Sequence, residues 1–336
     1  MPSQKRDPYW DNVKGILILL VVFAHFMNFS GTFYGFLSQG IYLFHMPLFI
    51  FVSGIFYKDT NLKQRILGLT IIGIVYNVLL IVIDDIFLRA EEKFYIFRAT
   101  KIPWFVFCVA LCSVITYILK DCGRIMVLAV AFFVAVVACY DAELMQFCVI
   151  AKTVCWFPMF YLGHILGSTN CKQLLQIKIG GVCGRWIRVC GGGIALLLFG
   201  IVAVATKGFC VGGMNFARLF GGTEVYESNS PFWMLAKCIY YLALSAVSIC
   251  VLNVAPTQQC GILTKLGRNS LQIYFWHIPI RSLVYALNIE EKICVGFWGK
   301  TGWALLSMLM AAALSYKIFS FPVKNILDGV KKEVRS

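Results

Sequence analysis

The residues best suited to chemistry are a lysine and a histidine near the start of the chain. They stand eleven residues apart in the otherwise apolar stretch DNVKGILILLVVFAHFMNF, residues 11–29. On an α-helix, this spacing leaves Lys14 and His25 within roughly 20° of one another and about 16 Å apart along the axis. Burial favours a neutral imidazole that can accept a proton, whereas a lysine can extend its ammonium group to a membrane surface. We therefore predict that His25 is a general base and that Lys14 lies at the cytoplasmic interface.

The histidines of the chain share one property, which is that all lie in predicted apolar spans: His25, His45, His164 and His277. Ionisable groups inside a bilayer are costly and are functional candidates by default. The alternative for each is a histidine that bonds a neighbouring helix and serves packing alone. Ser270 lies two turns before His277, on nearly the same helix face. Tyr274, between them, is expected to pack around a cavity.

A second group of polar residues closes the second predicted span, QGIYLFHMPLFIFVSGIFY. Ser53 and the glycine after it are small enough for a ligand or another backbone to approach closely. Tyr57 ends the span, and Arg65 lies in the basic turn that follows. Such a turn is either a topology signal or a site for a phosphorylated ligand. Lys14 at the same predicted membrane face favours the second interpretation.

The composition requires these residues to be positioned by membrane helices. Of 336 residues, 60% are hydrophobic and only 14% are charged, and the mean hydropathy is +0.79. We predict an all-α integral membrane protein, a single domain over residues 1–336 with no separate soluble domain. About ten transmembrane helices are expected, near residues 13–31, 40–57, 66–88, 103–120, 124–140, 149–168, 187–206, 231–253, 269–287 and 301–320.

The distribution of lysine and arginine predicts the orientation of this bundle. Placing the N-terminus in the cytoplasm puts most basic residues on the inner side, including the basic C-terminal tail, so that both termini are expected to be cytoplasmic. The net charge of +14 follows from this bias and from attraction to anionic lipid, and a nucleic-acid partner is not expected. The 14 cysteines are irregularly spaced in apolar segments, which favours neither a disulfide framework nor a metal site.

Five stretches carry a family resemblance: DNVKGILILLVVFAH, FHMPLFIFVSGIFY, PWFVFCVAL, WFPMFYLGHILG and LGRNSLQIYFWHIPI. In this order they resemble the acyltransferase type 3 family of polytopic membrane acyltransferases, and within it the branch related to fucose 4-O-acetylases. The family pattern of a basic residue, ten residues and a histidine falls on Lys14 and His25. Its serine-glycine-aromatic element falls on Ser53, Gly54, Phe56 and Tyr57. Many members also carry two arginines three residues apart, whereas here Arg65 is followed by Gly68.

The resemblance implies a membrane O-acyltransferase in which His25 is the catalytic residue. The donor would be acetyl-CoA, held through Lys14, Arg65, Ser53 and Tyr57. The acceptor would be a hydroxyl of a carbohydrate or cell-envelope glycan. The residues expected to bind it are His45, His277, Ser270 and Tyr274. His25 would act as general base or as a covalent acyl carrier, and sequence leaves both open. A partner from another span is needed to orient it, and Asn77 and Ser53 are the candidates.

The expected surroundings follow from this function. The chain would lie in the cell membrane, with membrane lipid, a lipid-linked or polymeric glycan acceptor and polysaccharide-synthesis proteins as partners. A transporter or flippase for a lipid-linked sugar is the alternative, because many spans and buried polar residues suit it equally. Transporters more often show two related halves with helices broken at mid-membrane. We see no such pairing in the sequence.

Overall fold

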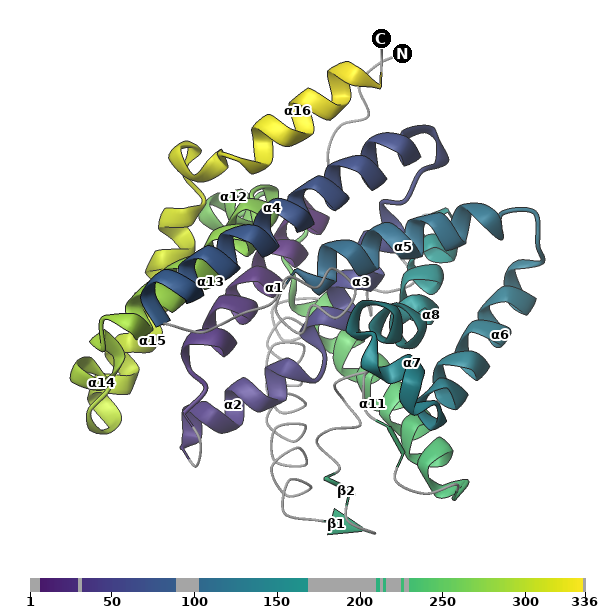
Figure 1. Ribbon diagram of the computed structural model, residues 1–336, viewed down its shortest axis with the longest axis horizontal. Helices are drawn as coiled ribbons and strands as arrows, with labels where there is room; N and C mark the ends of the chain where they lie inside the picture. Colours follow the sequence, from purple (N-terminus) through teal and green to yellow (C-terminus); the bar gives the residue numbers. More distant parts are fainter. Residues whose placement is uncertain are drawn as a thin grey trace.

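The computed structural model describes residues 7–29, 32–88, 103–168, 210–211, 214–215, 225–226 and 230–334, and these are mostly helical (Figure 1). The predicted span at 187–206 lies outside the described residues. Five helical segments are long and apolar enough to cross a membrane: Pro8–Phe26, Phe33–Ile55, Asp59–Phe87, Cys148–Gly167 and Phe232–Val254. Two shorter apolar helices cover Trp104–Ile118 and Arg124–Tyr140. The chain is thus a helical membrane protein, and the number of ten spans stays a prediction.

The N-terminal helix α1 spans Pro8–Phe26. It begins where the Asp7 carboxylate accepts a hydrogen bond from the Tyr9 backbone N–H at 3.0 Å, and proline at the first helical position suits a helix start. The helix therefore starts five residues before the predicted span 13–31 starts, and it ends five residues before that span ends. As a result Lys14 lies in the second turn and His25 in the last turn of α1, whereas the sequence placed His25 in the middle of its span.

The second predicted span, 40–57, corresponds to the segment Phe33–Ile55, but its bounds differ and it is not one continuous helix. The chain forms α2 over Phe33–Tyr42 and a separate helix α3 over His45–Ile55, with Leu43 and Phe44 between them. Thr32 caps α2, since its hydroxyl accepts from the Gly35 N–H at 3.2 Å. Pro47 in the first turn of α3 lacks an N–H, which suits a helix that begins there. The break makes His45 the first residue of α3.

Most of the other long helices follow the predicted spans within a few residues, whereas α15 begins five residues before the predicted span 301–320 and ends six residues before it does. The long ones are α4 Leu62–Leu88, α5 Trp104–Ile118, α6 Arg124–Val137, α8 Cys148–Ser168, α11 Phe232–Val254, α13 Ser270–Ala286 and α15 Gly296–Leu314. The short ones are α7 Ala142–Gln146, α12 Gly261–Arg268, α14 Ile289–Ile293 and α16 Val323–Glu333. Two strands of two residues, β1 Cys210–Val211 and β2 Met214–Asn215, pair antiparallel.

Glycines permit the closest helix crossings. A Cβ at Gly54 on α3 would collide with the Phe160 backbone of α8, and one at Gly163 on α8 would collide with the Phe51 backbone of α3. Helix α1 meets α12 in the same way, where Gly267 lies against the Asp11 backbone. These crossings fix α3 and α12 beside their partners through backbone contact.

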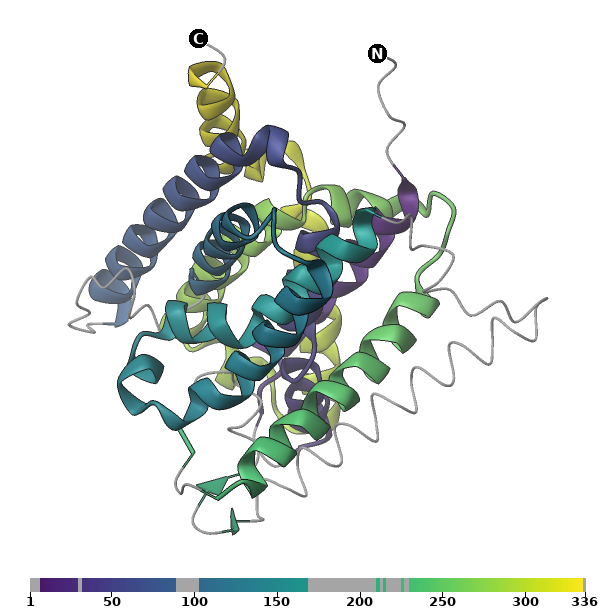
Figure 2. The same ribbon diagram turned by 90° about the vertical axis from the view of Figure 1, so that its right-hand side faces the viewer.

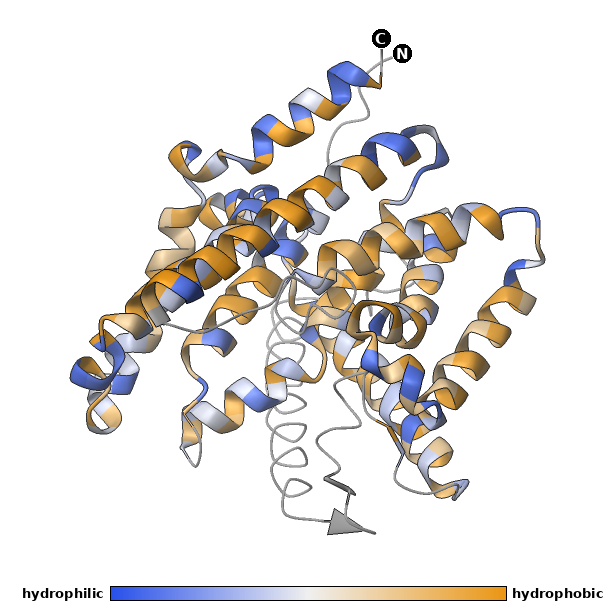
Figure 3. Cartoon of the chain, in the orientation of Figure 1, coloured by the Kyte–Doolittle hydropathy of each residue, from blue (hydrophilic) through white to orange (hydrophobic). Residues whose placement is uncertain are grey.

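Hydrophobic residues predominate along the long helices (Figure 3). Large hydrophobic side chains stand exposed on outward faces, among them Ile125 on α6, Leu242 on α11 and Leu309 on α15. In Figure 2, the start of α1 and the end of α16 lie toward the same end of the molecule. We refer to this as the terminal end of the bundle.

Candidate active site

A cavity of about 340 Å³ lies between α1, α3, α4, α5, α13 and α16. It gathers five residues that the sequence predicted to bind donor or acceptor: Lys14, Ser53, Arg65, Ser270 and Tyr274. Most of the other lining residues are apolar, among them Met46, Phe49 and Phe105. A mainly apolar pocket with a few convergent polar groups is the usual form of a small-molecule site.

The polar groups lie at one end of this cavity. Three helices each present a polar residue in an early turn and another lining residue about one turn later: Lys14 and Ile18, Arg65 and Leu69, Ser270 and Tyr274. Ser53 lies near the end of α3, just before the turn that leads into α4. The cavity is therefore charged near the terminal end and apolar farther in, which suits a ligand with a charged head and a less polar arm.

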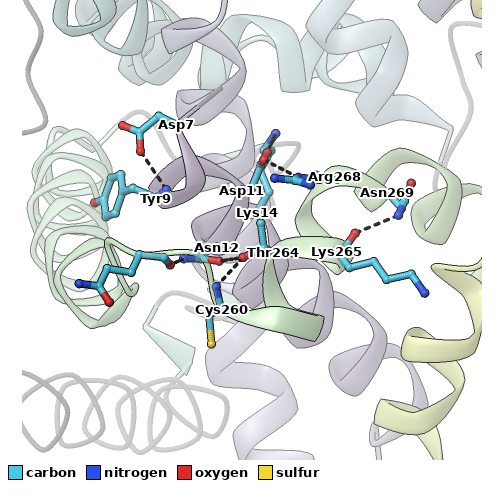
Figure 4. A network of polar contacts seen from close by, with 11 residues as sticks. Asp7, Tyr9, Asp11, Asn12, Lys14, Cys260, Thr264, Lys265, Arg268 and Asn269 are labelled. Atoms are coloured by element: carbon cyan, nitrogen blue, oxygen red, sulfur yellow. Dashed lines mark hydrogen bonds and ion pairs between the residues drawn. The ribbon is translucent and has the colours of Figure 1, made fainter. Parts of the chain in front are cut away.

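Lys14 belongs to a charged group at the junction of α1 and α12 (Figure 4). Its Nζ lies 3.0 Å from Asp11 Oδ1, and Arg268 Nε lies 3.3 Å from Asp11 Oδ2. The Asp11 side chain is only 2% exposed, so its carboxylate is buried between two cations. The junction is further held by Asn12, which donates to the Pro256 and Gln258 carbonyls and accepts from the Thr264 hydroxyl at 2.6 Å. Lys14 and Arg268 thus place two positive charges around this buried carboxylate, a short distance from the cavity that Lys14 lines.

Arg65 lines the cavity while it holds the end of α3. Its two terminal nitrogens donate to the Ser53 carbonyl at 2.9 Å and the Phe56 carbonyl at 3.3 Å. A cation at the C-terminus of a helix can donate hydrogen bonds to the last carbonyls, and it interacts favourably with the negative end of the helix dipole. Arginine carries five N–H donors, so donors remain for a ligand after these two bonds.

His25 has a hydrogen-bond partner that the sequence did not predict. The Tyr42 hydroxyl, at the end of α2, lies 2.9 Å from His25 Nδ1 and donates to the Ala24 carbonyl at 3.2 Å. Among the described residues, the side chain that hydrogen-bonds the His25 imidazole is therefore Tyr42. The sequence had predicted Ser53 or Asn77 as this partner, and neither is hydrogen-bonded to His25 in the described part of the chain. The spacing of apolar residues cannot reveal this contact, because it depends on the break between α2 and α3.

His25, His45 and His277 form one cluster with Tyr42. The ring centroids of His25 and His277 are 5.2 Å apart, and the Tyr42 ring lies 5.3 Å from His25 and 5.5 Å from His45. His277 is buried, and its Nδ1 faces the Tyr274 carbonyl at 2.8 Å and the Ile273 carbonyl at 3.2 Å. Since carbonyl oxygens only accept, Nδ1 carries the proton and Nε2 is left as an acceptor.

Two hydrogen-bonding nitrogen atoms in or near this cluster are buried. In the described part of the chain, His277 Nε2 and Arg281 Nε are shielded from solvent and lack a hydrogen-bond partner. Arg281 follows His277 by four residues on α13 and therefore lies on the same helix face. Sequence reasoning missed Arg281, although an arginine inside the predicted span 269–287 was the signal that could have found it.

The three clustered histidines are not among the described residues that line the cavity. Tyr274 connects the two features, because it lines the cavity and its ring lies 5.9 Å from that of His277. Its position is fixed by the Tyr76 hydroxyl, which donates to the Tyr274 carbonyl at 3.0 Å. On α13, Ser270, Tyr274 and His277 thus lead in successive turns from the polar end of the cavity to His25.

Two other candidates lie elsewhere. Tyr57 is buried against α8, with its ring 5.0 Å from that of His164 and 6.0 Å from that of Phe160, and it does not line the cavity. Burial raises the pKa of Tyr57 above its ordinary value, so the phenol is neutral. His164 is partly buried at the same crossing and belongs to the packing of α8.

Comparisons with known proteins agree with the helical membrane architecture and extend it to an activity. A stretch of 67 residues is 42% identical to the nodulation protein NolL of Sinorhizobium fredii, covering 18% of this chain and 18% of that protein. The chain thus spans less than a fifth of the length of this curated relative in the match. No solved structure matches the chain. Residues 7–319 match the family described as an acyltransferase domain, and the chain therefore belongs to the acyltransferase type 3 family of membrane acyltransferases that its motifs indicated.

Proposed function

We propose that this membrane acyltransferase moves an acetyl or other short acyl group from acyl-CoA to a hydroxyl of a carbohydrate or cell-envelope glycan. The observation that carries the proposal is the cavity with Lys14, Ser53, Arg65 and Ser270 near its polar end. Its inner end reaches Tyr274, which contacts His277 beside His25. A fucose 4-O-acetylase-like preference and a location in the cell membrane are parts of the same proposal.

The donor would enter from the cytoplasm, because coenzyme A carries phosphates that do not cross lipid. Lys14 and Arg65 would pair with phosphate oxygens, and the apolar walls would accept the pantetheine arm. The thioester would then reach the depth of Tyr274. Of the other predicted donor residues, Ser53 would contact the arm, and Tyr57 would act by packing α3 against α8.

The chemical step would use His25 Nε2. Because the Tyr42 hydroxyl donates to the Ala24 carbonyl, its oxygen can accept from His25 Nδ1–H, which leaves Nε2 with a lone pair. Nε2 would take the proton of the acceptor hydroxyl as its oxygen attacks the thioester carbonyl. The carbon-oxygen bond forms, the carbon-sulfur bond breaks, and the imidazolium returns the proton to the departing thiolate. A transient acetyl-histidine is the other route.

The acceptor would approach the opposite side of the histidine cluster. His277 Nε2 and Arg281 Nε are buried without partners among the described residues, so both can bind oxygen atoms of an incoming sugar. His45, whose Nδ1 faces the Ile41 carbonyl at 2.6 Å, would also turn its other nitrogen to the acceptor. In this proposal, donor and acceptor would lie on opposite sides of His25.

The direct test incubates purified protein with labelled acetyl-CoA and a pool of glycan acceptors. Thioester consumption that depends on acceptor is expected, with His25→Ala lowering the rate by about 10² to 10⁴. His164→Ala is the matched control, because it removes a spanning histidine outside the cavity and the cluster. A folded His25→Ala protein with full transfer would reject the mechanism. Failure of wild-type protein to consume thioester with any acceptor would favour the transporter alternative.

A further inference from the structure

The C-terminal helix α16 closes one wall of the cavity. Leu327 of α16 lines the cavity together with Lys14 and Arg65, although α16 follows α4 by more than two hundred residues in the chain. The helix packs against α4 and α13, and Figure 1 shows it beside α4 at the terminal end of the bundle. Any ligand held at the polar end of the cavity therefore meets α16.

Gly68 permits this contact. A Cβ at Gly68 on α4 would lie 2.9 Å from Leu327 Cδ2, closer than side-chain atoms normally approach. The segment that leads into α16 is fixed from the other side, because Trp276 on α13 donates from its indole N–H to the Phe319 and Phe321 carbonyls. The side-chain amide of Gln272, also on α13, donates hydrogen bonds to the Leu314 and Tyr316 carbonyls. These bonds hold the segment before α16 against α13.

Two lysines share the helix face of Leu327. Lys324 precedes it by three residues and Lys331 follows it by four, and residues at these spacings lie on one face of a helix. Both lysines are exposed, and about 10 Å of helix axis separates them. Lys332 carries the same charge but lies about 100° around the helix from Lys331. The buried face of α16 is formed by Val323 and Val330.

We propose that α16 is part of the donor site and that Lys324 and Lys331 bind the phosphates of the nucleotide end of acyl-CoA. This deepens the proposed function and rests on it for the identity of the donor. Arg65 donates to two backbone carbonyls and Lys14 is paired with Asp11, so each has part of its binding capacity already engaged. The separated phosphates of a nucleoside bisphosphate need cations at more than one point, and α16 carries two on the helix face of Leu327, which lines the cavity.

The test compares two donors in steady-state kinetics of the full-length protein. For acetyl-CoA, the Lys324→Ala/Lys331→Ala variant should raise KM about tenfold with kcat unchanged, because the lost contacts lie far from the thioester. For acetyl-pantetheine, which lacks the nucleotide phosphates, the same variant should leave KM unchanged. Lys332→Ala is the control and should behave as wild type with both donors.

Other outcomes overturn the proposal. An unchanged acetyl-CoA KM in the double variant, or an equal rise in Lys332→Ala, would show that α16 does not bind the phosphates specifically. Binding of adenosine 3′,5′-bisphosphate, measured by calorimetry, gives a second readout that needs no catalysis. If the wild type bound this probe and the double variant bound it about tenfold more weakly while no acyl donor were consumed, the phosphate site would stand and the proposed function would fail.

Discussion

At the scale of single residues, the chemistry depends on which imidazole nitrogen is free. His277 has its Nδ1 within reach of two carbonyl oxygens, and His25 has its Nδ1 at the Tyr42 hydroxyl. The two rings are adjacent, with centroids 5.2 Å apart. Fixing one nitrogen of each ring leaves the opposite nitrogen free to act in the proposed mechanism, and enzymes commonly orient a histidine base in this way.

Tyr42→Phe should lower kcat about fivefold while leaving the KM for the acyl donor unchanged. The substitution keeps the ring and removes the hydroxyl that positions His25, a loss comparable to one hydrogen bond of about 1 kcal/mol. Steady-state kinetics at saturating acceptor measures it.

Tyr34→Phe is the matched control for this substitution. Tyr34 also lies on α2, but its hydroxyl pairs with Thr301 Oγ1 at 2.6 Å, away from the histidines. It should retain wild-type kcat. Equal kcat values for both variants would mean that Tyr42 does not position the base.

His277→Asn should change the choice of acceptor without affecting the donor. Asparagine can replace the Nδ1 bond to the Tyr274 carbonyl, but it has no group at the place of Nε2, the buried atom that lacks a partner in the described chain. The ratio of kcat/KM for two acceptor sugars should therefore shift several-fold. The donor KM serves as the internal control. An unchanged ratio, with the protein folded, would remove His277 from the acceptor site.

At the scale of elements, close helix crossings keep the site in register. Ser53 reaches the cavity because α3 lies directly against α8, and this approach depends on glycine at the crossing. Where two backbones touch, even one added methyl group must separate them. The site therefore depends on residues that never touch substrate.

Gly54→Ala should destabilise the protein by about 1 to 3 kcal/mol, since its Cβ would collide with the Phe160 carbonyl of α8. Thermal unfolding in detergent, followed by circular dichroism, should show a lower midpoint. Gly302→Ala in α15 is the control, because a Cβ there meets nothing within 4 Å and alanine favours helix. A midpoint for Gly54→Ala equal to that of the control would contradict the crossing.

The break between α2 and α3 is a feature that the sequence did not predict. Apolar runs predicted the helices well because burial in lipid needs continuous apolar residues, and the spans on α4, α8 and α11 agree with the structure within a few residues. The run through Leu43 is equally apolar, so nothing in its hydropathy indicates an interruption. Tyr42 was missed as the partner of His25 for this reason. Contacts of this kind depend on tertiary geometry.

At the scale of the whole molecule, the predicted donor residues converge although they are distant in sequence. Lys14, Arg65 and Ser270 come from three helices and line one cavity, because each lies near the start of a helix that begins toward the terminal end. Motif order in the chain predicted the family, and the structure agrees with a common site for these residues. The proposed role of α16 was not predicted, because the sequence of an amphipathic basic tail is equally compatible with a free surface helix.

This convergence predicts the side from which donor is used. The polar end of the cavity lies where α1 begins and α16 packs, and the basic residues near it, including Lys58, Lys63 and Lys265, are those that favour the cytoplasmic side. In sealed membrane vesicles, added acetyl-CoA should therefore be consumed when the cytoplasmic face is outward, and hardly at all in vesicles of the opposite orientation. Detergent permeabilisation is the control and should make both preparations equally active. If intact vesicles of both orientations consumed the donor at the same rate, both the assignment of this end to the cytoplasm and the entry route through Lys14 and Arg65 would be wrong.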